Sequence, residues 1–73
     1  MNDYERDLAA RLTALIPAYD VRIRKQRPGA SDDYVWRAVA TAINHDNAAP
    51  LMRVVDSRFV LNIVTKHYGV DLR

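Results

Sequence analysis

Residues 31–45, SDDYVWRAVATAINH, decide the fold because they contain a complete helix signal. Ser31 is a preferred N-cap residue, and the two aspartates that follow place negative charge at the positive end of a helix dipole. Apolar residues then recur at helical spacing on one narrow arc, namely Val35, Trp36, Val39, Ala42 and Ile43. The solvent side of the same helix carries Asp33, Arg37, Thr41 and Asn44. The pattern predicts a helix over residues 32–45 that inserts Trp36 into the core.

Two further helices are predicted on either side of this one. Toward the N-terminus, one face of a helical repeat carries Tyr4, Leu8, Leu12, Leu15 and Ile16, which predicts a helix over residues 3–16 that Pro17 ends. Toward the C-terminus, Asp56 and Ser57 form a cap signal and Gly69 is a left-handed stop, which together predict a helix over residues 57–68. Apolar residues cover more than half of that last helix, so it is either central to the bundle or partly open to a partner.

The connections between these helices are less regular. Residues 19–27 alternate apolar and charged side chains, which predicts an extended basic connection with one side packed and the other exposed. Residues 50–55 fit either a short helix with Pro50 in its first turn or an apolar loop, and we favour the short helix. The sequence therefore predicts an all-α bundle of three main helices, forming a single domain over residues 1–73.

Composition limits the class of protein. The chain has 73 residues, of which 49% are hydrophobic and only two are glycine, and this combination is typical of a small helical domain. Cysteine is absent, so the chain forms no disulfide and offers no thiolate to zinc. It contains no run of ~20 apolar residues, and its acidic first residues do not resemble a secretory signal. We therefore expect a soluble cytoplasmic protein with no membrane contact.

The sequence contains no recognisable catalytic or metal-binding pattern. His45 and His67 lie on different predicted helices, without the spacing of a metal motif. Ser31 and Ser57 are explained as helix caps. Two glycines cannot form a glycine-rich phosphate loop. We therefore expect no enzymatic activity, no metal, no cofactor and no small-molecule substrate.

Positive charge is concentrated in residues 22–27, RIRKQR, which hold four cations and no acid. These cations are Arg22, Arg24, Lys25 and Arg27. Of the eleven basic residues in the chain, the other seven are outnumbered by nine acidic ones, so the excess is local. We interpret this basic segment as a contact site that projects into water, and a simple solvated loop is the alternative. Its partner would be an acidic protein surface or a nucleic acid.

Two other groups of residues are candidate contact sites. Leu51, Met52 and Arg53 combine apolar and basic character on a predicted connection, which is typical of a protein-docking patch. Alternatively, residues 47–66 can be interpreted as a helix-turn-helix in which the last helix contacts DNA. Its DNA-facing residues would be Arg58, Asn62 and Lys66.

The length, the predominantly helical pattern and the arginine-rich run VRIRKQR resemble those of small phage-encoded transcription regulators that bind host RNA polymerase. The resemblance implies a non-enzymatic protein in the host cytoplasm. It would bind the N-terminal region of the polymerase β′ subunit, inhibit initiation and affect termination. Direct DNA binding through the last helix is one alternative function. Self-association through the apolar side of that helix is a second.

Overall fold

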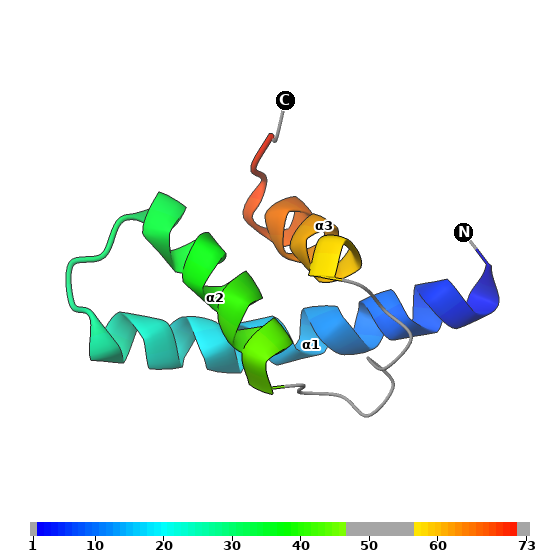
Figure 1. Cartoon of the computed structure of the whole chain (residues 1–73), viewed down its shortest axis with the longest axis horizontal. Coiled ribbons are helices and arrows are strands. Elements are labelled where there is room, and N and C mark those ends of the chain that lie inside the picture. Colours follow the sequence, from blue (N-terminus) through cyan, green and yellow to red (C-terminus); the bar gives the residue numbers. More distant parts are fainter. Residues whose placement is uncertain (1, 47–56, 72–73) are drawn as a thin grey trace.

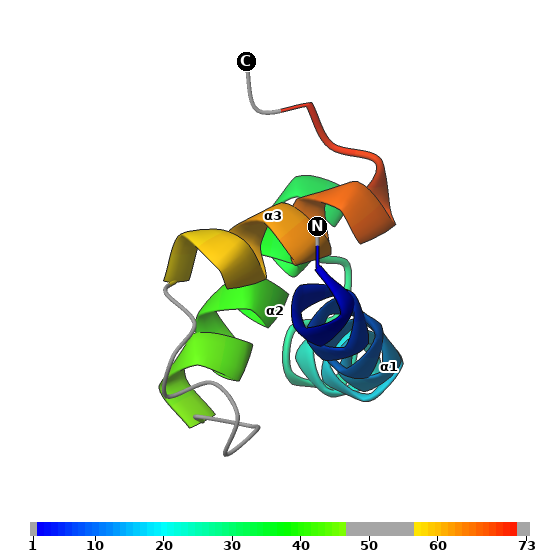
Figure 2. The same ribbon diagram turned by 90° about the vertical axis from the view of Figure 1, so that its right-hand side faces the viewer.

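The computed structural model describes residues 2–46 and 57–71, and within these ranges the chain forms three α-helices (Figure 1). They are α1 (Asp3–Gln26), α2 (Asp32–Asp46) and α3 (Ser57–Tyr68). Each helix contacts both of the others. Figure 2, viewed from the N-terminal end of α1, shows α2 and α3 beside each other on one side of that helix. The all-α three-helix bundle predicted from the sequence is confirmed.

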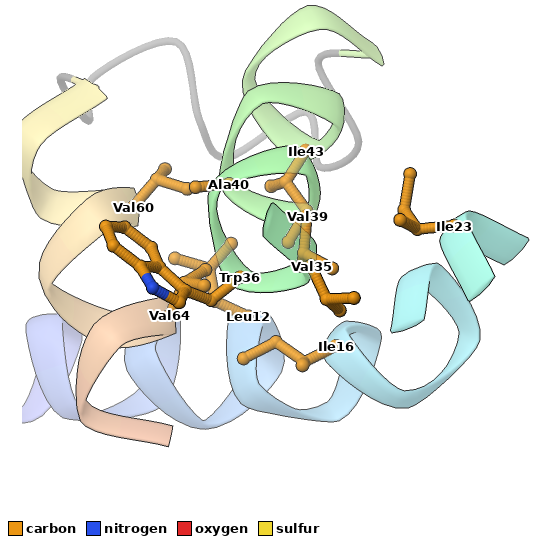
Figure 3. Close-up of a cluster of buried hydrophobic side chains, with 10 residues drawn as sticks. All are labelled: Leu12, Ile16, Ile23, Val35, Trp36, Val39, Ala40, Ile43, Val60 and Val64. Carbon is orange, nitrogen blue, oxygen red and sulfur yellow. The ribbon is translucent and has the colours of Figure 1, made fainter. Parts of the chain in front are cut away.

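The hydrophobic core lies where the three helices meet, and α2 contributes the largest share of it (Figure 3). Val35, Val39 and Ile43 of α2 are fully buried, and Trp36 is 5% exposed. The indole nitrogen of Trp36 donates a hydrogen bond to Asp33 at 3.3 Å, so the one polar atom of that ring is satisfied. The core is completed by Ala40 of α2, by Leu12, Ile16 and Ile23 of α1, and by Val60 and Val64 of α3.

Helix α1 does not end at Pro17, and the predicted extended connection over residues 19–27 is wrong. The helix continues through Pro17 to Gln26. Ile16 and Ile23 are buried seven residues apart, with half-buried Tyr19 between them, which is helical spacing. Val21 is 53% exposed, whereas an extended strand would have placed it on the same side as Ile23. An alternating sequence fits both a strand and a helix, and only the pattern of buried residues distinguishes the two.

Tertiary packing and helix electrostatics outweigh the proline. Proline lacks one backbone N–H, so α1 loses a hydrogen bond at Pro17. Pro17 and Thr13 are both exposed, so water can satisfy the carbonyl of Thr13 that would have accepted that bond. Arg24 and Lys25 lie in the last turn of the helix, where positive charge is favoured by the dipole. The cations that suggested a binding loop thus also stabilise a helix end.

The helix ends that the sequence marked with caps are where the prediction placed them. Ser31 accepts a hydrogen bond from the backbone N–H of Tyr34 at 3.1 Å, and α2 begins at the next residue. Gly69 has a φ of 70°, and the N–H of Val70 bonds to the carbonyl of Thr65, so the chain turns out of α3 in the left-handed conformation that glycine favours. Gly29, with a φ of 80°, forms the turn between α1 and α2 in the same way.

Asp20 and Arg24 join the C-terminal half of α1 to the other two helices. Asp20 accepts a hydrogen bond from the hydroxyl of Tyr68 in α3 at 2.6 Å and from the guanidinium of Arg24 at 2.8 Å. Arg24 also reaches Asp32 in the first turn of α2 at 3.2 Å. The hydrogen bond from Tyr68, followed by that from Arg24, lowers the pKa of Asp20 below its usual range. Burial and the hydrogen bond to Asp20 raise the pKa of Tyr68.

Part of the predicted organisation concerns residues that the structure does not describe. The short helix near residues 50–55 lies outside the described residues, as do Leu51, Met52 and Arg53. Over residues 2–46 and 57–71, no helix combines the length and the apolar character needed to cross a membrane. Tyr4, which the pattern placed on the packed face of the first helix, is 51% exposed, because α1 extends past both other helices at this end (Figure 1).

The continuity of α1 can be tested at Pro17. We expect Pro17→Ala to raise the free energy of unfolding by about 1–2 kcal/mol, because it restores a backbone N–H within an intact helix. Urea denaturation followed by far-UV circular dichroism measures this change. An unchanged or lower stability would show that the helix is interrupted at residue 17.

The Asp20 junction can be tested with Tyr68→Phe. Loss of a hydrogen bond to a charged acceptor is expected to lower the free energy of unfolding by about 1–2 kcal/mol. Because the folded pKa of Asp20 is lowered, its contribution to stability is present above about pH 4 and is lost as the pH falls through the folded value. Tyr68→Phe should therefore reduce the stability difference between pH 6 and pH 3. Tyr4→Phe, at an exposed position, is the control, and an equal effect of both variants contradicts the assignment.

Candidate functional site

The structure separates the four cations of the basic segment into groups with different surroundings. Arg24 is held between Asp20 and Asp32, and Arg22 lies 3.3 Å from Asp46 at the end of α2. The expectation that all four cations project freely into water is therefore wrong for these two arginines. Arg22 is 24 residues from Asp46 in the sequence, and Arg24 is eight residues from Asp32. The packing of α1 against α2 brings each pair together.

Arg24 is mainly a structural residue. Its hydrogen bond to Asp32 connects α1 to α2, while Asp20 holds it from one turn earlier in α1. These two carboxylates raise the pKa of its guanidinium. Its side chain is 45% exposed, so it remains part of the surface. A partner that bound Arg24 would have to break contacts that hold α1 and α2 together.

Arg22 belongs to a more exposed cluster around Asp46. One carboxylate oxygen of Asp46 accepts hydrogen bonds from the hydroxyl of Tyr19 at 2.9 Å and from an N–H of Arg22 at 3.3 Å. The other carboxylate oxygen lies 3.4 Å from Nδ1 of His45. The hydrogen bonds from Tyr19, His45 and Arg22, in that order of size, lower the pKa of Asp46. Arg22 also stacks on the ring of Tyr19, with 4.6 Å from Cζ to the ring centroid.

Lys25 and Arg27 are the cations that agree best with the prediction, because both are exposed. The guanidinium of Arg27 stacks on the ring of Tyr34, at 4.5 Å from the centroid, and Tyr34 is itself 39% exposed. An arginine held flat against an exposed aromatic ring keeps its N–H groups available at the edge of the plane. These two residues remain candidates for electrostatic contact with a partner.

An open groove lies between the C-terminal half of α1 and α2, and we call it the α1–α2 groove. Small side chains line it at Ala38, Thr41 and Ala42. Larger side chains line it as well, at Arg22, Tyr34, Arg37, His45 and Asp46. The groove therefore combines an apolar lining with two arginines, and one residue of the predicted basic segment, Arg22, belongs to it.

Sequence reasoning missed the contribution of α2 to this groove. Arg37 was placed on the solvent side of its helix, which is correct, but without a function. The structure pairs it with Asp33 at 3.4 Å and stacks it on Trp36 at 5.1 Å. Tyr34, Ala38, Thr41 and His45 recur at helical spacing, so the sequence did contain a signal for one continuous face. What it could not provide was the position of α1 beside that face.

The alternative DNA-binding residues Arg58, Asn62 and Lys66 are exposed and share one side of α3. Arg58 also lines a second groove, between α2 and α3, together with Arg37. The first helix of the predicted helix-turn-helix lies in residues 51–55, outside the described residues. The apolar side chains of α3 are buried or half-buried, so this helix presents no exposed large apolar residue for self-association.

Metal chemistry has no support in the part of the chain that the structure describes. Over residues 2–46 and 57–71, no group of three or more histidine, cysteine or acidic side chains is close enough to hold a metal ion. His45 and His67 lie on different helices. His45 approaches Asp46, and the ring of His67 lies edge-on to that of Tyr68.

The different roles of two neighbouring cations can be tested by the same charge reversal at each. We expect Arg24→Glu to lower the melting temperature, because it places a third carboxylate beside Asp20 and Asp32. Lys25→Glu makes the same change of net charge at an exposed position in the same last turn, so it loses a favourable interaction with the helix dipole and should lower the melting temperature much less. Equal melting temperatures for the two variants would contradict the structural role of Arg24.

Comparison of this chain with models of protein families, with curated proteins and with solved structures finds no match. Its function must therefore be inferred from its own surfaces. The described residues offer two candidates: the α1–α2 groove with the neighbouring Lys25 and Arg27, and the exposed polar side of α3.

Proposed function

We propose that this chain is a non-enzymatic transcription regulator that acts by contact with another protein, and that the α1–α2 groove is its contact surface. The observation that carries the proposal is the composition of this groove. Small apolar side chains of α2 lie beside the arginines at positions 22 and 37, as in interfaces where an apolar contact is surrounded by charge. A groove of this kind suits a segment that carries both apolar and acidic side chains.

Charge favours an acidic partner. Arg37 and Arg22 line the groove, and Arg27 stacks on Tyr34, which also lines it. Lys25 lies in the last turn of α1, three residues after Arg22. The ion pairs of Arg22 and Arg37 with their own acids are exposed, and such pairs contribute little to stability because water and salt screen them. A partner can therefore compete for these arginines without unfolding the domain.

The identity of the partner follows from the resemblance to small phage regulators and not from the groove. The proposed partner is the N-terminal region of the RNA polymerase β′ subunit, and the proposed effect is inhibition of initiation together with an effect on termination. Leu51, Met52 and Arg53 remain predicted docking residues outside the described part of the chain. The same surface would serve any protein partner with an acidic and partly apolar segment.

DNA binding through α3 is the second candidate. The exposure of Arg58, Asn62 and Lys66 on one side of a 12-residue helix is the observation that favours it. Only two of these residues are cations, so the expected dependence of affinity on salt is shallow, with a log-log slope of roughly −2. A protein that depended on this side of α3 would bind duplex DNA without RNA polymerase.

Capture of RNA polymerase can distinguish the two candidates. We expect Lys25→Glu/Arg27→Glu to weaken retention of purified polymerase by roughly tenfold, because the reversed charges repel an acidic partner. Arg6→Glu/Arg11→Glu is the matched control, since it makes the same change of net charge at exposed positions on the N-terminal half of α1. The control should retain polymerase as well as the unaltered protein does.

A gel shift with duplex DNA, run beside the capture, tests the second candidate. Under the proposed function, the protein retains polymerase and does not shift DNA at moderate salt. The alternative would replace the proposed function if the protein shifted DNA but did not retain polymerase, and if Arg58→Glu/Lys66→Glu abolished that shift.

A further inference from the structure

Asp46 occupies an unusual place for an acidic residue, because it is the last residue of α2. A carboxylate at the C-terminal end of a helix is disfavoured by the helix dipole. Asp46 is held there by the hydroxyl of Tyr19, by Arg22 and by the neighbouring ring of His45. Arg22, His45 and Asp46 all line the α1–α2 groove. Two donors for a carboxylate, Arg22 and His45, are therefore built into the wall of the groove, and the chain's own Asp46 occupies them.

The pairing between Arg22 and this acid is not an optimal one. Only Nη1 of Arg22 donates to Asp46, and the distance of 3.3 Å is longer than the roughly 2.7–2.9 Å of a strong charge-assisted hydrogen bond. Guanidinium groups bind carboxylates best through two parallel N–H groups. The stacking on Tyr19 holds the Arg22 guanidinium against that ring, which reduces the freedom that a new pairing would remove. The side chain of Arg22 is 46% exposed, so an incoming group can reach it.

We infer that Arg22 is a binding site for an acidic side chain of the protein partner, and that Asp46 occupies this site as an internal competitor until the partner replaces it. The inference rests on the proposed function of the α1–α2 groove and adds the ligand chemistry and its regulation. The ligand is a carboxylate of an aspartate or glutamate, because the group that occupies the donors in the free protein is itself a carboxylate. Removal of Asp46 therefore strengthens partner binding.

The experiment measures binding of a fluorescein-labelled decaglutamate peptide by fluorescence anisotropy at low salt. We expect Asp46→Asn to bind the peptide roughly two- to fivefold more tightly than the unaltered protein, the range that corresponds to one exposed ion pair. Asp7→Asn is the matched control. It removes the same charge and frees Arg11 from an exposed pair at 3.0 Å, but it lies ~22 Å from residue 22 along α1. It should change the affinity much less.

Two further variants separate local competition from the general effect of charge. Tyr19→Phe removes the hydroxyl that holds Asp46 and keeps both the net charge and the ring on which Arg22 stacks. It should also tighten peptide binding, and it provides the test if Asp46→Asn does not fold. Arg22→Gln should lower the affinity and remove the gain from Asp46→Asn in the double variant.

The outcomes distinguish this inference from the proposed function. Equal affinities for Asp46→Asn and Asp7→Asn, or no gain from Tyr19→Phe, would overturn the competition while the groove remained the binding surface. An equal gain in binding to a 12-base-pair DNA duplex would overturn the assignment to carboxylates. If neither the unaltered protein nor any variant binds the peptide, the proposed acidic partner and the inference are both wrong.

Discussion

Asp20 and Arg24 together connect the C-terminal half of α1 to both other helices, and the candidate site depends on this connection. Beyond Ile16, the only buried apolar side chain of α1 is that of Ile23, which is still 8% exposed, so apolar burial alone fixes this half of the helix weakly. The hydrogen bonds of Asp20 to Tyr68 and Arg24, and of Arg24 to Asp32, add directional contacts to two different helices. In a chain of 73 residues, whose core is small, such contacts decide where a helix end lies. The α1–α2 groove exists because this half of α1 is held beside α2.

The cations of the basic segment have different surroundings that the sequence does not reveal. Positive charge at the end of a 24-residue helix is favoured by the dipole, which explains part of the cluster without any partner. Arg24 joins helices, Arg22 meets Asp46, and Lys25 and Arg27 stay at the surface. The local excess of charge on this side of the molecule is therefore much smaller than the run RIRKQR suggests. The proposed binding surface accordingly depends on a groove with both apolar and charged residues, and not on a continuous basic strip.

The sequence predicted the features of the fold that local chemistry determines. Ser31 and Gly69 mark helix ends through their own backbone and side-chain properties, so the bounds of α2 and α3 were predicted to within one residue. The prediction was wrong at residues 19–27, because an alternating sequence fits a strand and a helix equally well. The helix continues past Pro17, and Ile23 is buried on its packed side. Two pairs join residues that are far apart in the sequence: Arg22 with Asp46 at the candidate site, 24 positions apart, and Asp20 with Tyr68 at the junction of α1 and α3, 48 positions apart. No periodicity within one helix can reveal a pair of that kind.

The ionisation state of Asp46 determines how a partner would displace it from Arg22. The hydrogen bonds from Tyr19 and His45 lower its pKa, so this carboxylate stays ionised to a lower pH than an ordinary aspartate does. At neutral pH Asp46 is therefore an ionised competitor for Arg22, and a partner must displace it with an anion of its own. Since one carboxylate would replace another, the exchange itself yields little free energy. The affinity of a partner must then come mainly from contacts along the groove with Ala38, Thr41 and Ala42, while the exchange at Arg22 sets which partners are accepted.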